Sequence, residues 1–348
     1  MGQQGGLTSH AMMPLWVDED MGVDQNSLAD VVKYKLAALF PDARTDDLFI
    51  NALLRKQRIL VIVDSVSERS LATREYLKKI YSFTRAEAMV ITARSPIAIE
   101  GVTPTKLFLQ PLDEDTLLYF MQALLQLNVE KNQGKPVRVS LDEQMTLDQK
   151  LSALYRRSVR GVGNILPLPV RLFVEEAKAI KANSGSLDSL PQSIPDVYSR
   201  YLERVNPDNP SVPNFISQGE MLRAAKVLAK LALGADFIPK EFDGAEATTE
   251  LKKEGWTDPE KIDPIQRLLD NGILISKGEL INRRLKFVLD PIAEYLAAAA
   301  RLQEVRHDPI KLDLLREDAR NAAGFLTALD LLARTNEPAP SQPGISQK

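Results

Sequence analysis

The sequence predicts an α/β protein in which a parallel sheet is wrapped by helices and is followed by a mostly helical region. The apolar, largely β-branched run Ile59–Val63 ends at Asp64. This pattern is typical of a buried parallel strand that carries a carboxylate at its end. Strand-like segments also alternate with helix-like segments over the first 112 residues. Such alternation indicates strands joined by crossover helices.

Local signals predict each element of this first part. Met13–Val17 is predicted as a short strand, and Ser27 with Asp30 forms a capping box that opens a helix. Four leucine and valine residues, Leu28, Val32, Leu36 and Leu39, are predicted to share one face of that helix. The remaining elements are a helix over 46–54, the strand ending at Asp64, a helix over 71–80, a strand over 88–92 and a short strand over 107–109.

From Asp113 onward the apolar spacing becomes helical, and Asp113 is a suitable N-cap. Breaks rich in Asn, Gly, Ser and Pro interrupt this pattern at 132–136, 183–191 and 206–213. We expect the second break to be an exposed linker before a helix over 195–205, and the third to be the last domain boundary.

The final part combines helices with a hairpin. Helices are predicted over 220–233 and 262–269, and two apolar segments, 272–275 and 285–289, follow them. Helices followed by a hairpin are typical of a winged helix. A further helix is predicted over 291–304, beginning with a proline whose missing N–H costs nothing there.

Composition limits the classes of function. The net charge of −3 supplies no broad positive field, which disfavours nucleic acid or an acidic membrane as the main partner. The absence of cysteine excludes disulfides, thiol catalysis and thiolate metal sites, and suits a reducing compartment. No apolar run approaches the roughly 20 residues that cross a bilayer. We therefore expect a soluble cytoplasmic protein with no membrane partner.

Polar residues at two strand ends are the candidates for chemistry. Asp64 can hold the water shell of a magnesium ion, although such a residue often only caps the next helix. Glu68 can orient an attacking water, or can be an exposed acid at a helix start. Arg94, two residues after Thr92, can contact a terminal phosphate, or can pair with a neighbouring acid.

Four segments in order resemble the motifs of one family. Leu60–Glu68 resembles an extended Walker B segment, and Val90–Arg94 resembles a sensor 1 strand with its T-x-R ending. Leu166–Leu172 is similar to the proline motif of a small helical domain, and Phe287–Ala298 resembles the F-x-H and EYLAA end of a winged helix. By these motifs the chain resembles NACHT-type members of the STAND class of P-loop ATPases.

The resemblance implies a switch in which ADP locks the winged helix and ATP exchange releases it to oligomerise. ATP or ADP with Mg²⁺ would be the cofactors. In that scheme Asp64 would hold magnesium through water, and Glu68 would help to position water. Arg94 would sense the γ-phosphate, and Pro169 would pack on the adenine. The implied fold is a partial parallel P-loop NTPase-type sheet, a helical domain and a winged-helix domain.

The chain also departs from the family pattern. The phosphate-binding motif G-x-x-x-x-G-K-[ST], Walker A, does not occur in its 348 residues. Ser65 and Ser67 stand where the family has glycine and usually aspartate, and Leu289 stands at the F-x-H histidine. Hydrolysis of ATP is therefore not expected of this chain. Whether it is a truncated form or a natural form without a P-loop stays open.

Two alternatives to the switch remain. The first is a non-catalytic protein-interaction scaffold that kept the architecture and lost the nucleotide. The second, a winged-helix transcription regulator, needs a basic recognition surface. The predicted recognition helix instead mixes Asp263, Gln266, Arg267 and Asp270. A basic turn at Arg156, Arg157 and Arg160 is best explained as a solvated helix face.

The missing Walker A strand has a physical consequence. It is central in sheets of this family, so its absence would leave unpaired strand edges and an apolar groove. We therefore expect self-association or binding of other protein chains. The predicted division of the chain is a flexible leader over 1–12, a partial nucleotide-binding α/β domain over 13–112, a small helical domain over 113–206, a winged-helix domain over 207–306, and a helical extension with a disordered tail over 307–348.

Overall fold

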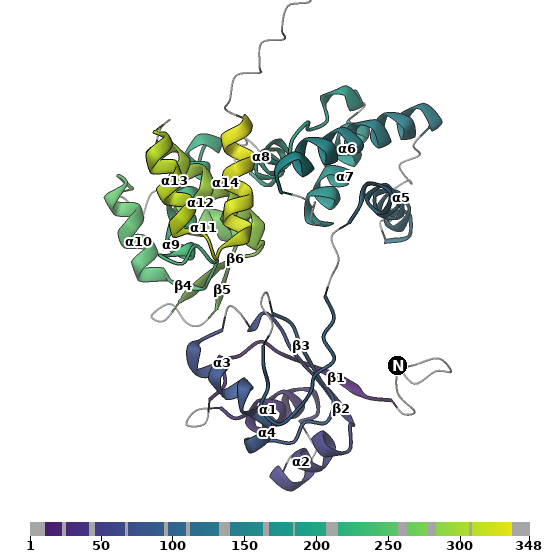
Figure 1. The fold of residues 1–348 in the computed structure, drawn as a ribbon, viewed down its shortest axis with the longest axis vertical. Coiled ribbons are helices and arrows are strands. Elements are labelled where there is room, and N and C mark those ends of the chain that lie inside the picture. The colour runs from purple at the N-terminus through teal and green to yellow at the C-terminus, as the bar shows by residue number, and fades with distance from the viewer. Residues whose placement is uncertain are drawn as a thin grey trace, which may run out of the picture. The chain divides into compact units, whose positions relative to one another are not determined.

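The computed structural model shows two compact units, 1–108 and 109–348 (Figure 1). The structure describes residues 11–22, 26–41, 46–66, 69–93, 97–108, 112–131, 140–162, 167–183, 185–206, 215–256, 263–277, 283–305 and 308–335.

The first unit is built on a three-stranded parallel sheet in the order β1-β2-β3. The strands are β1 (Met13–Val17), β2 (Ile59–Val63) and β3 (Met89–Ile91). The helices between them are α1 (Leu28–Leu39), α2 (Asp47–Arg55), α3 (Leu71–Lys78) and α4 (Ile80–Phe83). The prediction of an α/β protein with a parallel sheet is confirmed for this unit, but in the described residues α1 to α4 pack on one face of the sheet rather than around it.

One face of the sheet forms the core of the first unit. Alternate strand residues, Leu15 and Val17 on β1 and Ile59, Val61 and Val63 on β2, are buried in a single apolar cluster with residues of α1, α2, α3 and α4. The alternation follows from the two-residue period of a strand, which sends neighbouring side chains to opposite faces.

The local signals at α1 are largely as predicted. Ser27 and Asp30 form the reciprocal capping box, and Leu28, Val32 and Leu36 are buried. Leu39 is exposed instead, because it is the last residue of the helix and lies beyond the core cluster.

The predicted strand over 107–109 is wrong for the residues described, since Leu107 and Phe108 pair with no strand and are exposed.

The second unit is mainly helical and is organised around one continuous apolar cluster. Its elements are α5 (Glu114–Lys131), α6 (Leu141–Val162), α7 (Pro167–Ala182), the short 3₁₀ turn η2 (Leu187–Ser189), α8 (Ile194–Val205), α9 (Gln218–Leu233), β4 (Phe242–Asp243), α10 (Gly244–Lys253), α11 (Pro264–Asp270), β5 (Leu274–Lys277), β6 (Arg284–Phe287), α12 (Asp290–Val305), α13 (Pro309–Asp318) and α14 (Ala323–Thr335). The Asp113 side chain accepts the Thr116 N–H at 2.8 Å, as expected of an N-cap.

From α9 to β6 the order is helix, strand, two helices and a hairpin, and the antiparallel sheet runs β4-β6-β5. The sequence did not indicate β4, because two residues are too short to show an alternating pattern. Arg267, predicted on the mixed face of the recognition helix, is only 2% exposed, and its Nε donates to Asn206 Oδ1 at 2.9 Å. This arginine therefore cannot serve a recognition surface.

The segment predicted as an exposed linker before α8 is partly a core element. Leu187 and Leu190 are buried in the apolar cluster. The Ser186 side chain accepts the Asp188 N–H at the start of η2, and this turn brings both leucines to the inside.

Within the described ranges, none of the helices has the length and apolar content to cross a bilayer.

Packing of α14 on α12 depends on a glycine. A Cβ at Gly324 would overlap the carboxyl group of the buried Glu294. We expect Gly324→Ala to lower the free energy of unfolding by about 1–3 kcal/mol, because the buried carboxyl group must move. Chemical denaturation measures this change.

Gly219 supplies the matched control, since it lies in α9 with nothing within 4 Å of a built Cβ. Gly219→Ala should be neutral or stabilising by up to about 1 kcal/mol. In the double variant with Glu294→Ala, the Gly324→Ala penalty should largely disappear. An unchanged stability of Gly324→Ala alone would show that Glu294 gives way freely, and would contradict the prediction.

A pH-dependent contact joins α12 to α9. Glu304 Oε1 lies 2.7 Å from Lys230 Nζ, and Glu304 Oε2 lies 3.0 Å from Arg301 Nη1. Burial alone raises the pKa of Glu304, but the hydrogen bonds from Lys230 and Arg301 outweigh it and hold the pKa below the ordinary 4.5. The folded protein therefore binds this proton less readily than the unfolded chain does.

The contribution of Glu304 to stability should be complete above pH 4.5 and should be lost as the pH falls through the lower folded pKa. We expect Glu304→Gln to cost about 0.5–1 kcal/mol at pH 7 and progressively less as the pH falls below 4.5. Thermal unfolding across this range tests it. A difference that grows toward low pH would have the wrong sign and would refute the assignment.

Candidate functional site

The carboxyl ends of the three parallel strands meet at one edge of the first unit. The register aligns Val17 with Val63 and Val63 with Ile91, so the strands end at the same level. The next residue of each strand is Asp18, Asp64 or Thr92, respectively. This edge is where open α/β sheets bind ligands.

Asp64 and Thr92 are joined directly. The Thr92 hydroxyl donates to Asp64 Oδ1, and the Ser65 N–H donates to Thr92 Oγ1 at 2.9 Å. The Val66 N–H also donates to the Thr92 carbonyl at 3.0 Å. Ser65 has a φ of +55°, a left-handed conformation that costs a residue with a Cβ about 1–2 kcal/mol. The chain therefore turns sharply after β2 and keeps the Asp64 carboxylate beside Thr92.

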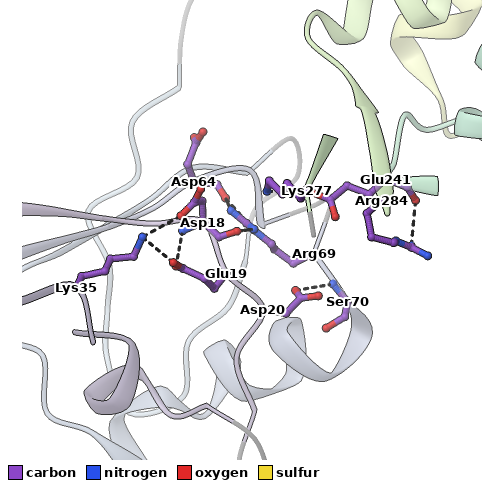
Figure 2. Close-up of polar contacts among 10 residues, drawn as sticks. All are labelled: Asp18, Glu19, Asp20, Lys35, Asp64, Arg69, Ser70, Glu241, Lys277 and Arg284. Carbon is purple, nitrogen blue, oxygen red and sulfur yellow. Dashed lines mark hydrogen bonds and ion pairs between the residues drawn. The ribbon is translucent and has the colours of Figure 1, made fainter. Parts of the chain in front are cut away.

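Arg69 connects two of the strand ends. Its Nε and Nη2 donate to the Asp64 carbonyl at 3.2 and 3.0 Å, and its Nη1 donates to the Asp18 carbonyl. One half-buried guanidinium thus bridges the ends of β1 and β2 (Figure 2). Sequence reasoning missed this residue, because its partners are main-chain carbonyls and leave no side-chain pattern to recognise.

The acidic residues after β1 are engaged with neighbours. Lys35 Nζ lies 3.0 Å from Asp18 Oδ1 and 2.7 Å from Glu19 Oε1. Burial lowers the pKa of Lys35, but its hydrogen bonds to Glu19 and Asp18 and their charges outweigh this and raise it. Asp20 Oδ1 accepts the Ser70 N–H at 3.2 Å (Figure 2). It also accepts the hydroxyl of the buried Thr73 at 2.9 Å.

The predicted site residues fall in different parts of the chain. Asp64 lies at the strand-end edge as expected, and it is half-buried. Glu68 and Arg94 lie outside the residues that the structure describes. Pro169 belongs to the second unit, where it is buried in the first turn of α7. Thr92, predicted only as part of a motif, contacts Asp64 directly.

The donor set around Asp64 can be compared with what magnesium needs. No cluster of three or more His, Cys, Asp or Glu side chains suited to a metal occurs within the described part of the chain. Magnesium keeps several of its waters and often takes only one or two carboxylates from the protein. One half-buried carboxylate beside a threonine hydroxyl fits a water-mediated contact, and does not fit a site formed by protein ligands alone.

A second candidate is an open groove of about 530 Å³ on α6 in the second unit. Its lining residues are Asp148, Gln149, Ser152, Ala153, Arg156 and Arg157. Arg156 lies 3.0 Å from Glu114, and its hydrogen bond lowers the pKa of that carboxyl group. Arg157 donates to the carbonyl and side chain of Gln192 at 3.2 Å. These bonds favour a structural role for Arg156 and Arg157. The side chain of Arg160 lies outside the part of the chain that the structure describes.

Comparison of the sequence with protein-family models finds no match, and comparison with curated proteins finds no similar sequence. Family membership therefore stays a prediction from the four motifs.

The bridge formed by Arg69 makes a testable contribution to the first unit. We expect Arg69→Met to lower the free energy of unfolding by about 2 kcal/mol, because partly buried carbonyls of Asp64 and Asp18 lose their charged donor. Fluorescence of Trp16 on β1 reports the transition when Trp256 is replaced by Phe. Arg74→Met, at an exposed arginine of α3, which follows Arg69 in the chain, is the control and should change stability by less than about 0.5 kcal/mol. Equal effects of the two substitutions would contradict the bridging role.

Proposed function

We propose that this chain is a portion of a NACHT/STAND-type signalling ATPase and acts as a nucleotide-dependent oligomerisation switch. The observation that carries the proposal is the contact between Asp64 and Thr92 at the carboxyl edge of a parallel sheet. In the resembled family the Walker B acid and the sensor 1 threonine occupy two such strand ends.

The geometry supports nucleotide binding at this edge in two ways. The half-buried Asp64 carboxylate is held by Thr92, so that little reorganisation is needed to order the water shell of a magnesium ion. Arg69 ties together the main chain at the ends of β1 and β2, which keeps the edge rigid. The bound metal would neutralise charge on the phosphates of ATP or ADP.

The remaining roles are proposals from the family motifs. Glu68 would help to position water, Arg94 would contact the γ-phosphate, and Pro169 would pack on adenine. Without the Walker A motif, the main-chain amides and lysine that cradle phosphates are not provided by this sequence. We therefore propose binding with little or no hydrolysis.

The second unit would supply the moving part of the switch. The order of elements from α9 to β6, with its β4-β6-β5 sheet, supports assignment of this region as a winged helix. In the proposed scheme ADP favours the locked state, and ATP favours release and self-association with other copies or protein chains. Nucleotide shifts such an equilibrium only by its difference in affinity for the two states.

One observation favours a second candidate, a non-catalytic interaction scaffold. Leu289, at the position of the family's phosphate-contacting histidine, is half-buried and packs against the apolar core of the second unit. Its carbonyl accepts the N–H groups of Ile292 and Ala293 at 3.0 and 3.3 Å. An apolar core residue at this position has no means of contacting a phosphate.

Binding of labelled ATP and ADP, measured with magnesium on the full chain, tests the switch. We expect binding at micromolar concentrations, weakened about tenfold by Asp64→Asn, which corresponds to about 1.4 kcal/mol. Asp20→Asn is the matched control, because it removes a charge from the same edge while its side-chain oxygen can still accept from Ser70 and Thr73. The control should bind nearly as tightly as the unaltered chain.

Two results would count against the switch. Absence of binding at millimolar nucleotide would leave the scaffold as the better explanation. Equal weakening by Asp64→Asn and Asp20→Asn would indicate a general charge effect rather than a site at Asp64. Light scattering in ATP and in ADP separates the oligomerisation step from binding, since the switch requires larger particles in ATP.

A further inference from the structure

The edge of the first unit opposite to Asp64, where the parallel strands begin, carries a group of exposed positive charges. Its members, here called the basic edge, are Arg55, Lys56, Arg58 and Arg85. Arg58 immediately precedes β2, and Arg85 lies shortly before β3. The net charge of −3 does not reveal this group, because it averages over the whole chain.

Three of these cations lie on one turn with a defined hydrogen-bond pattern. The Gln57 N–H donates to the Leu54 carbonyl at 3.4 Å, and the Arg58 N–H donates to the Leu53 carbonyl at 3.0 Å. These are the two bonds of a Schellman motif, which ends α2 with Gln57 in a left-handed conformation at a φ of +53°. The main chain that carries these cations is therefore held in one conformation.

A main-chain bond brings the fourth cation to the same turn. The Glu87 N–H donates to the Leu54 carbonyl at 3.3 Å, so the segment that includes Arg85 runs beside the turn. Glu87 is exposed and is the acid nearest to Arg85 along the chain. Among the residues that the structure describes, neither Glu87 nor any other acid forms an ion pair with the basic edge. An excess of positive charge therefore faces solvent.

The helix dipole accounts for only part of this charge. Arg55 lies in the last turn of α2 and Lys56 is its C-cap, where positive charge is favourable. Arg58 and Arg85 lie outside the helices. Their exposed guanidinium groups have no described partner within the unit, so both remain able to bind an anion.

An aromatic ring lies close to this charge along the chain. Phe83 is the last residue of α4, and its ring stacks on that of Tyr76 with centroids 5.4 Å apart and planes 12° from parallel. Tyr76 is buried, and its hydroxyl accepts the Leu28 N–H at 3.0 Å, so the supporting ring is fixed. Phe83 is 48% exposed. Since one face of its ring lies on Tyr76, the other face is available to a flat group.

Positive charge beside a fixed, exposed aromatic ring is the combination that binds single-stranded nucleic acid. The cations contact phosphates of the backbone, and a base stacks on the ring. An acidic peptide would use the charges and leave the ring without a role. A duplex keeps its bases stacked on one another, so it offers no free base to Phe83.

We propose that the basic edge and Phe83 bind single-stranded nucleic acid. The guanidinium and ammonium groups contact phosphates, and the outer face of Phe83 stacks on one base. This inference stands on charge and ring geometry, and it does not depend on nucleotide binding at Asp64.

Fluorescence anisotropy of labelled oligothymidine and oligouridine of about 12 nucleotides, added to the full chain, tests the proposal. We expect both strands to bind at micromolar concentrations in low salt and to bind more weakly as salt is raised. For a single strand the logarithm of the binding constant falls with the logarithm of salt concentration by about 0.7 for each phosphate contacted. Four cations should therefore give a slope of about −3.

Substitutions separate the phosphate contacts from the stacking contact. Arg58→Gln and Arg85→Gln combined should make the slope shallower by about 1.4. Phe83→Leu keeps an apolar side chain on Tyr76 but removes the ring, so binding should weaken about tenfold with an unchanged slope. Phe83→Tyr keeps the ring and should bind as the unaltered chain does, which separates loss of stacking from loss of folding.

Two control variants belong to this series. Arg320→Gln removes an exposed positive charge from α13 in the second unit and should change neither affinity nor slope. Gln57→Gly keeps the turn, because glycine adopts a positive φ without strain, and it should also leave binding unchanged.

Several outcomes would overturn the proposal. They are absence of binding by both strands in low salt, an equal effect of Arg320→Gln and the paired substitutions, and full binding by Phe83→Leu. Polyglutamate or phosphatidylserine vesicles that bind as tightly as the strands would also overturn it, because the edge would then recognise negative charge without a base.

Discussion

The architecture of the first unit depends on the right-handed sense of its two crossover connections. With β2 paired in parallel between β1 and β3, this constraint puts every connecting helix on one face and every strand end at one edge. The candidate site and the exposed sheet face that carries Trp16 and Val90 are therefore two consequences of the same topology. The site collects the residues that follow the strands, and the helices of the described residues pack on the opposite face.

Hydrogen bonds hold this edge of the sheet in one conformation. Thr92 holds the Asp64 carboxylate, and Arg69 holds the main chain of both Asp64 and Asp18. The sharp turn after β2 requires Ser65 to adopt a left-handed conformation, which costs conformational free energy. Surrounding contacts must offset this cost. Here the Ser65 N–H donates a hydrogen bond to Thr92 Oγ1.

Prediction from the sequence succeeded where the signal was local. The β-branched run before Asp64, the capping box at Ser27 and the spacing of α9 each correspond to an observed element. It failed where neighbours in space decide the outcome. Leu107 resembles a strand residue but has no strand beside it, and Leu187 lies in a polar stretch but is drawn into the core.

The sequence by itself determined the α/β class, the order of the strands along the chain and the position of Asp64 at a strand end. These features depend on hydrophobic periodicity and local capping, which operate within a few residues. Only the tertiary structure decided that Arg69 bridges two strand ends, that Arg267 is buried against Asn206, and that Trp16 and Val90 share an uncovered face. The two hydrogen-bonded contacts join residues from 5 to 61 positions apart, and the shared face follows from strand order, so no local pattern encodes these features.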